Sequence, residues 1–339
     1  MFSYRKWFGL FFVITLGCQA EKPTSPATTS SDAAASTPAR PIDVTLALNW
    51  YAEAEHGGFY AALVHGYYSE EGLNVTIRPG GPGVPVIQDV ATGKIEFGID
   101  NADKLILLRA QQADAVAVMS PMQNSPRCIM VHKKSGLTSL EDLAKMKEFT
   151  LAINPGQPFA QFLKKKVNLD EVRVVPYQPD VAKFMEEPNF GQQAYRFSEP
   201  FVAEKQGGDP LCLMLSDLGF NAYTSVLLAR REMIEQQPDI VARMTRASIR
   251  GWKKYLAEPD ETNKHIHEQN PGMGMDILAF GAKALRPVCI PEGFDESRLG
   301  EMSADRWQTL VAQMIEIGSI KPDTVKAEDA YSLKFLEQK

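Results

Sequence analysis

The chain of 339 residues has the composition of a globular protein with an acidic balance: 44% of its residues are hydrophobic, 23% are charged, and the formal net charge at pH 7 is -6. This length is enough for two domains or one large one. The charge argues against a nucleic-acid-binding protein, because the densest basic run, Lys164–Lys166, falls at the end of a predicted helix, where cations interact favourably with the helix dipole.

The first residues have the pattern of an export signal. Arg5 and Lys6 precede an apolar run from Trp7 to Leu16, and small residues follow this run. The run is too short to span a bilayer as a helix. We therefore expect residues 1–17 to direct export and to be removed, which would leave a periplasmic or cell-surface protein.

Cys18 follows this signal directly. The segment Thr15–Cys18 is similar to the cleavage box of bacterial lipoproteins, in which the cysteine becomes the lipidated first residue, although Thr15 stands where that box usually has leucine. We expect Cys18 to be lipidated, with an ordinary secretion signal as the alternative. Residues 18–41 are rich in Ser, Thr, Ala and Pro and would form a flexible tether, so that the protein meets the membrane only through its lipid anchor.

The folded part is predicted to begin with a strand, a helix and a second strand. Alternating apolar residues indicate strands over 44–48 and 73–77, and an apolar stripe from Phe59 indicates the helix between them. The pair Gly57 and Gly58 is expected to let the backbone turn tightly before this helix.

The loop after the first strand carries Asn49, Trp50 and His56. In open α/β sheets, small ligands bind at the carboxyl ends of the strands. This loop is therefore a candidate ligand site, and the alternative for Trp50 is an ordinary core aromatic residue.

Strands and helices continue to alternate through most of the chain, and polar residues again follow the strands. Further strands are expected over 95–99, 115–119, 128–132, 150–153, 172–176, 193–197 and 211–215. The polar residues placed in the candidate site by this pattern are Asp100, Asn101, Gly156, Gln157 and Glu199. The alternation predicts an α/β fold.

The strand-like segment Tyr223–Arg230 could return the chain to the part that contains the first strands, and the sequence beyond Glu232 is mostly helical. Ser139 is expected to cap a helix that runs through Leu140 and Leu143.

The cysteines other than Cys18 are Cys128, Cys212 and Cys289. They form no CxxC pair and have no histidine at metal-ligand spacing, so we expect no metal site. We expect buried free thiols, although an exported location permits one disulfide among them.

Five segments together resemble a known family: the periplasmic solute-binding proteins of ABC importers that share a family with the fungal thiamine-pyrimidine synthase. The segments are Leu48–His56, His65–Val75, Thr92–Ile99, Lys134–Leu143 and Ser216–Arg231, and the resemblance covers the chain from about Val44 to about Tyr255. It implies a two-lobe periplasmic-binding-protein (type II) fold that closes around a ligand at a hinge. Lobe I would comprise residues 42–126 and 222–339, and lobe II residues 127–221.

The resemblance also implies a function. The chain would be a monomeric lipoprotein that delivers a small heterocycle, foremost an aminopyrimidine precursor of thiamine, to an ABC permease in the inner membrane. Riboflavin or an alkylsulfonate is the alternative ligand for relatives of this fold. Trp50 matches the aromatic residue that stacks on the ring in pyrimidine-binding members, and Glu199 matches a glutamate that accepts hydrogen bonds from a ring amino group. Asn49 and His56 match polar positions, and Tyr195 and Tyr223 would form a second wall.

The synthase of the same family is the enzyme alternative. The resemblance places its pyridoxal-phosphate lysine at Asp100 and its substrate histidine at Lys104, and its run of cysteines at about Leu218–Tyr223, where this chain has none. Without an amine at the first position, the Schiff base with the cofactor has no anchor. We therefore expect no cofactor, no catalytic residues and no enzymatic activity.

Overall fold

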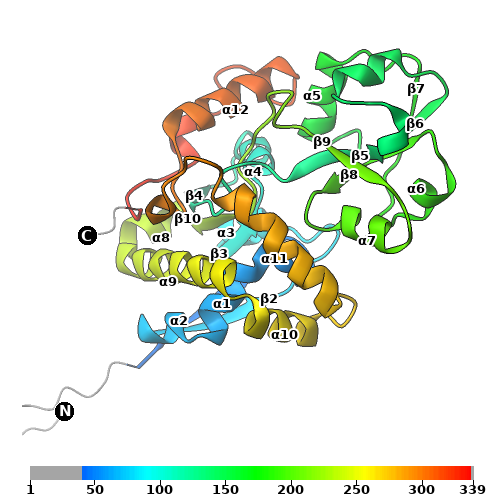
Figure 1. Cartoon of the computed structure of the whole chain (residues 1–339). Coiled ribbons are helices and arrows are strands. Elements are labelled where there is room, and N and C mark those ends of the chain that lie inside the picture. The colour runs from blue at the N-terminus through cyan, green and yellow to red at the C-terminus, as the bar shows by residue number, and fades with distance from the viewer. Residues whose placement is uncertain (1–39, 337–339) are drawn as a thin grey trace, which may run out of the picture. The chain divides into compact units, whose positions relative to one another are not determined.

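The computed structural model describes residues 40–336, so the predicted export signal, Cys18 and most of the predicted tether lie outside the described residues. The described chain folds into two α/β lobes, each built on one five-stranded sheet (Figure 1). We call them lobe I, which contains the N-terminal strands, and lobe II, which is coloured green in Figure 1.

The sheet of lobe I has the strand order β2-β1-β3-β10-β4. Its strands β1 and β2 run parallel, whereas β10 runs antiparallel to both β3 and β4. The strand β10 therefore returns the chain to the sheet of lobe I. The strands are β1 Ile42–Ala47, β2 Leu73–Arg78, β3 Phe97–Asp100, β4 Ala115–Met119 and β10 Val226–Arg230.

The sheet of lobe II has the order β7-β6-β8-β5-β9, with β5 antiparallel to both of its neighbours. Its strands are β5 Arg127–His132, β6 Phe149–Ala152, β7 Val172–Val175, β8 Phe190–Tyr195 and β9 Pro210–Met214. The chain passes between the lobes twice, through residues 120–126 and residues 215–225. Asn221 links the two passages, because its Nδ2 donates to Asn124 Oδ1 (3.0 Å) and its Oδ1 accepts from the Ser125 backbone N–H (2.8 Å).

The helices of lobe I come from both ends of the chain, and those of lobe II from its middle (Figure 1). Lobe I contains α1 Gly57–Val64, α2 Tyr67–Glu70, α3 Val86–Ala91, α4 Ala102–Arg109, α8 Arg231–Gln236, α9 Pro238–Ala257, α10 Asp260–Gln269, α11 Met275–Cys289 and α12 Ala304–Glu316. Lobe II contains α5 Pro158–Lys166, α6 Ala182–Glu186 and α7 Glu199–Lys205. The 3-10 helices are η1 Ala54–His56, η2 Lys133–Ser135, η3 Glu141–Lys145, η4 Glu296–Arg298 and η5 Ala327–Asp329.

The expected cap at Ser139 is wrong. The segment forms the 3-10 helix η3, and the carboxylate of Asp142 accepts hydrogen bonds from the backbone N–H groups of Thr138 and Ser139, each at 3.1 Å. The Asp142 carboxylate thus satisfies these N–H groups, which would otherwise lack a partner at the start of the helix. The Ser139 hydroxyl makes no capping hydrogen bond.

Gly57 and Gly58 have a different role from the predicted tight turn. Both belong to α1, and Gly57 has helical backbone angles (φ -53°, ψ -42°). A Cβ atom on Gly57 would lie 2.1 Å from the Tyr255 ring, and one on Gly58 would lie 2.1 Å from the Trp252 ring. The glycines are therefore needed because α1 and α9 pack in close contact.

Replacing Gly251 by alanine is expected to destabilise lobe I. Gly251 lies on α9, and its Cβ atom would come within 2.1 Å of the Gly58 backbone oxygen, which cannot move without displacing α1. Overpacking of this kind costs about 1–3 kcal/mol of unfolding free energy. Urea denaturation measures the change. Gly156→Ala is the control, because nothing lies within 4 Å of its Cβ position; equal stability of the two variants would contradict the close packing.

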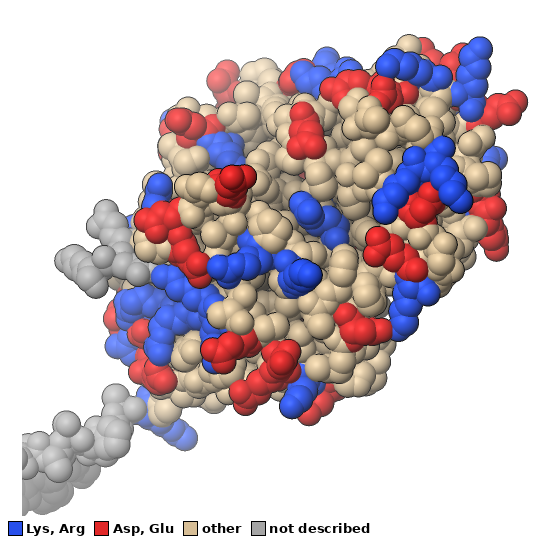
Figure 2. Space-filling view, viewed as in Figure 1, with Lys and Arg blue, Asp and Glu red and all other residues tan. Residues whose placement is uncertain are grey.

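Acidic and basic side chains are interspersed over the face of the molecule shown in Figure 2. Within residues 40–336, no helix combines the length and the apolar character needed to cross a membrane.

Candidate functional site

Residues after two strands of lobe I meet at one edge of its sheet. β1 and β3 run parallel, so their carboxyl ends lie at the same edge, and the antiparallel β10 begins there. Asn49 follows β1, Asp100 ends β3, and Ser225 immediately precedes β10. The pairing of Val226 with Asp100 places the β10 start directly beside the β3 end. The topology thus brings together residues that are far apart in the sequence.

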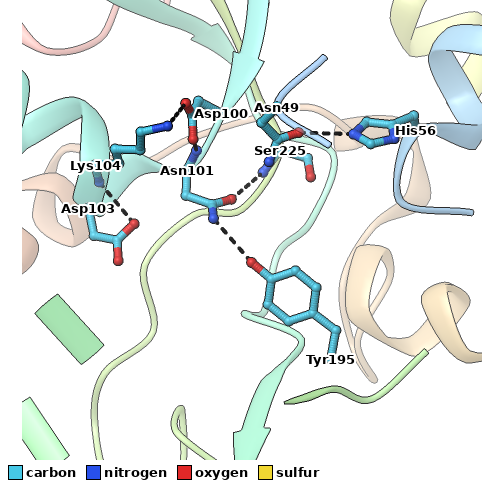
Figure 3. A network of polar contacts seen from close by, with 8 residues as sticks. All are labelled: Asn49, His56, Asp100, Asn101, Asp103, Lys104, Tyr195 and Ser225. Carbon is cyan, nitrogen blue, oxygen red and sulfur yellow. Dashed lines mark hydrogen bonds and ion pairs between the residues drawn. The ribbon is translucent and has the colours of Figure 1, made fainter. Parts of the chain in front are cut away.

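Asn101 connects this edge to lobe II (Figure 3). Its side-chain Nδ2 donates to the hydroxyl oxygen of Tyr195 in lobe II at 3.1 Å, and its Oδ1 accepts from the Ser225 backbone N–H at 3.3 Å. Two of the residues predicted for the site, Asn101 and Tyr195, are therefore in direct contact across the lobes.

Asp100 is committed to an ion pair inside lobe I. Its carboxylate is 2% exposed, lies 2.7 Å from Lys104 Nζ, and accepts from the Asn101 backbone N–H at 2.9 Å. Burial nevertheless dominates and raises the pKa of Asp100, with Lys104 opposing the shift. Asp100 therefore helps to fix the position of Asn101 and α4.

His56 holds the loop that carries Asn49. Its Nε2 donates to Asn49 Oδ1 at 2.9 Å, and its side chain is fully buried at the end of η1. Burial lowers the pKa of His56 to about 3, so the imidazole is neutral at physiological pH. The ring shapes the loop and orients the Asn49 amide.

Lobe II contributes Glu199 at the first turn of α7. One carboxylate oxygen accepts from the Tyr177 hydroxyl at 2.8 Å, and the other accepts from the Tyr195 backbone N–H at 2.9 Å. Burial raises the pKa of Glu199, although these hydrogen bonds oppose the shift. A carboxylate has about four lone-pair positions, so each oxygen can still accept a hydrogen bond from a ligand.

Arg127, at the start of β5, supplies positive charge beside the site. It donates to the Tyr195 hydroxyl at 3.1 Å and lies over the Phe159 ring at 4.3 Å from its centroid. Burial alone would lower the pKa of Arg127, but Tyr195, Asp103 and Glu55 together raise it. The guanidinium of lobe II therefore faces carboxylates of lobe I.

Two acidic residues of lobe I that were not predicted for the site, Glu53 and Glu55, lie buried there. Glu53 is 7% exposed and Glu55 1%, and the Ser225 hydroxyl donates to Glu55 at 2.5 Å. Burial raises the pKa of Glu53 well above its ordinary value, and repulsion from Glu55 and Glu199 raises it further. Burial also raises the pKa of Glu55. Carboxyl groups of both lobes thus converge at one place.

This acidic cluster, formed by Glu53, Glu55, Asp100 and Glu199, is expected to make the free energy of unfolding fall as the pH rises. The pKa values of these four carboxyl groups are raised in the folded protein. At a pH above the ordinary carboxyl pKa of about 4 to 4.5, the folded protein therefore binds more protons than the unfolded chain does. The stability contribution of the protonated groups is complete below that range and is lost as the pH rises through the raised values.

Thermal or urea unfolding of the ligand-free protein at about pH 5 and about pH 8 measures this loss. Glu53→Gln should flatten the profile because it removes the group with the strongest upward shift. The exposed Glu204 serves as a control position, and Glu204→Gln should retain the slope. A slope unchanged by Glu53→Gln would show that Glu53 is ionised in the folded protein throughout.

Some of the predicted site residues lie apart from this network. Gly156 and Gln157 are exposed between β6 and α5. The Tyr223 side chain is buried in lobe I, where its hydroxyl accepts from the Ser303 backbone N–H at 2.9 Å and its ring packs against Trp307. Trp50, by contrast, directly follows Asn49 of the network, and it is half-buried in edge-to-face contact with Tyr51 at 5.4 Å.

The residues that sequence reasoning missed are Glu53, Glu55, Ser225, Arg127 and Tyr177. For the two glutamates the sequence held a signal, because they alternate with the buried Ala52 and Ala54 in the same loop as Trp50. Arg127 and Tyr177 carry no such local signal, since their importance comes from contacts made after folding.

The side chains at the two positions that match the synthase, Asp100 and Lys104, do not offer a free amine to the aldehyde of pyridoxal phosphate. Asp100 has no amine, and the amine of Lys104 is engaged with Asp100 at 2.7 Å. Within residues 40–336, no group of three His, Cys, Asp or Glu side chains is placed to hold a metal ion.

The fold is that of the periplasmic binding proteins. The structure is similar to the periplasmic aliphatic sulphonate binding protein SsuA from Escherichia coli, with a TM-score of 0.65 and 15% identity, over 88% of this chain and 95% of that chain. The predicted fold class is therefore confirmed.

Within this fold, the chain belongs to the NMT1/THI5-like family, whose model matches residues 53–262. The riboflavin-binding protein RibY of Chloroflexus aurantiacus is 27% identical over 264 residues, 74% of each chain. The formylaminopyrimidine-binding protein of Halalkalibacterium halodurans is 24% identical over 296 residues, 85% of this chain and 89% of the relative. The 4-amino-5-hydroxymethyl-2-methylpyrimidine phosphate synthase of Legionella pneumophila is 23% identical over 67% of this chain and 74% of the relative. The predicted family is confirmed.

Proposed function

We propose that this chain is an exported solute-binding protein that holds a small amino-bearing heterocycle between its lobes and delivers it to an ABC permease. The preferred ligand is a thiamine-precursor aminopyrimidine. The proposal is supported by the fold, by the family and by relatives with the names of riboflavin- and formylaminopyrimidine-binding proteins.

The main evidence for an amino-bearing ligand is the acidic cluster. Four carboxyl groups stand beside two cationic groups, Lys104 and Arg127, and Lys104 is already paired with Asp100. The Glu53 carboxyl is buried, and repulsion from two further carboxyls, Glu55 and Glu199, adds to the rise of its pKa. Such a site favours a ligand that donates several N–H groups and disfavours an anion such as a sulfonate.

The proposed mechanism is ligand-dependent closure of the lobes. Glu53 and Glu55 come from lobe I and Glu199 from lobe II, so closure brings like charges together unless they are protonated or bridged by a donor. A ligand shifts the equilibrium only through contacts that it makes better in the closed state. Amino groups placed between the two sets of carboxylates would provide such contacts, with Trp50 against the ring face.

The synthase alternative is disfavoured because of Asp100 and its pairing with Lys104. That alternative requires a pyridoxal-phosphate absorbance band on the purified protein after incubation with the cofactor, and this band would have to disappear on borohydride reduction. We expect no such band and no catalytic turnover.

The decisive experiment combines mass spectrometry of the small molecules that co-purify with the protein and calorimetric titration with three ligands. We expect an aminopyrimidine to bind, and riboflavin and an alkylsulfonate to bind weakly or not at all. Binding of the alkylsulfonate alone would overturn the ligand class, and no heat with any of the three would overturn the binding function.

Export and anchoring are tested separately by labelling cells with a radioactive fatty acid. Incorporation into the wild type and its loss in Cys18→Ala would support the anchor. An unlabelled wild type, or a Cys18→Ala protein that stays at the membrane, would contradict it. A single species with the mass of a monomer in light scattering would support the proposed oligomeric state.

A further inference from the structure

The sulfur atoms of two cysteines lie side by side in lobe II. Cys128 is on β5 and Cys212 is on the neighbouring strand β9, and their Sγ atoms are 2.8 Å apart. In the antiparallel register Cys128 pairs with Met214 and Met130 pairs with Cys212, so the two cysteines are diagonal neighbours on one face of the sheet. Residues 84 positions apart in the chain are thus brought into sulfur contact by the strand pairing.

The two sulfur atoms are closer than non-bonded sulfur atoms normally approach, and a disulfide would bring them only about 0.8 Å nearer, to the usual bond length of about 2.05 Å. The third described cysteine, Cys289, is buried on α11 in lobe I and is not a competitor for this pairing.

The exposure of the two thiols differs in a way that suits oxidation. Cys128 is fully buried among apolar side chains that include Phe184 and Phe190, whereas Cys212 is only partly buried at the edge of this cluster. Cys212 is therefore the more exposed of the two residues, so a reaction with an external reagent would begin there and be completed by Cys128.

We propose that Cys128 and Cys212 form an intramolecular disulfide when the protein meets a disulfide-bearing oxidant. The Cys212 thiolate attacks a sulfur of the oxidant, and one oxidant sulfur leaves as a thiolate. The Cys128 sulfur then attacks Cys212 Sγ and displaces the second oxidant sulfur. The protein loses two protons and two electrons, and the oxidant disulfide becomes a dithiol. This inference does not depend on the identity of the ligand.

The position of the bond gives it a mechanical consequence. β5 begins directly after the passage of residues 120–126, and β9 ends directly before the passage of residues 215–225. A bond between Cys128 and Cys212 would covalently join the two strands at the point where both passages enter lobe II. Cross-linking restricts the unfolded chain and thereby stabilises the folded state.

Peptide mapping of the full protein tests the proposal. The protein is treated with oxidised glutathione, remaining thiols are alkylated under denaturing conditions, and the digest is analysed by mass spectrometry without reduction. We expect a cross-linked peptide that contains Cys128 and Cys212, with Cys289 alkylated. Alkylation of both Cys128 and Cys212 after oxidation, or a cross-link that involves Cys289, would overturn the pairing.

Thermal unfolding with and without a reductant gives the second readout. The oxidised wild type should melt a few degrees higher than the reduced protein. Cys212→Ser should abolish this difference, and it is preferred to Cys128→Ser because Cys212 is less buried. Cys289→Ser is the matched control and should retain the difference. An oxidised wild type that melts at the same temperature as the reduced protein would contradict a stabilising bond.

Discussion

Replacing Glu199 by glutamine is expected to weaken the binding of an aminopyrimidine by about 10- to 100-fold, which is the range for loss of a charge-assisted hydrogen bond. Glutamine keeps the size of the side chain and one acceptor oxygen, so the hydrogen bond from either Tyr177 or the Tyr195 backbone can persist. What the variant loses is the negative charge that a ligand amino group would meet. Calorimetric titration measures the change in Kd.

A comparison of two ligands shows whether Glu199 recognises the amino group or whether its substitution only disturbs the fold of the site. Glu199→Gln should weaken amino-bearing ligands more than the same ring without its amino group, because only the former use the carboxylate. Glu204→Gln lies on the same helix, α7, at an exposed position, and should leave the Kd unchanged. Equal losses for both ligands would remove the assigned role of Glu199.

Replacing Trp50 by alanine is expected to weaken binding by a similar factor of about 10 to 100, because the ligand would lose both an aromatic stacking partner and the burial of its ring face. Trp50 follows β1 in the same loop as Glu53, and its backbone oxygen accepts from the Gly80 N–H at 2.8 Å. This bond is made by the backbone, so the substitution leaves the loop anchored.

Trp50→Phe is the matched comparison and should restore most of the affinity, since it returns an aromatic face of smaller area. Thermal unfolding of both variants in the absence of ligand checks that the loop remains folded. Unchanged ligand affinity in Trp50→Ala would show that the ring is held by other groups and that Trp50 only packs against Tyr51.

The alternation of strands and helices, and the polar residues that follow strands, could be predicted because both are local patterns. Asn101 was identified in this way, whereas Tyr195 came from the family resemblance; the two meet across the lobes at 3.1 Å. The strand character of β10 could also be predicted from the segment Tyr223–Arg230. These predictions depend only on which face of an element is apolar and on where the element ends.

Other features depend on what the chain meets after folding. Tyr223 looked like a wall of the site, but its ring is taken up by Trp307, a residue 84 positions further along the chain. Glu53 and Glu55 were not predicted for the site, and both are buried there. The glycines before Phe59 looked like a turn, and they accommodate the side chains of α9. In each case the deciding neighbour lies far away in the sequence.

The raised pKa of Glu53 links ligand capture to the movement of hydrogen ions. If the carboxyl carries a proton when the empty lobes meet, a ligand that donates an N–H to it displaces that proton into the solvent. Part of the heat observed in calorimetry would then come from the buffer that takes up the hydrogen ion and would differ between buffers of different ionisation enthalpy. The ligand and the proton are, in this sense, competitors for the same oxygen atoms.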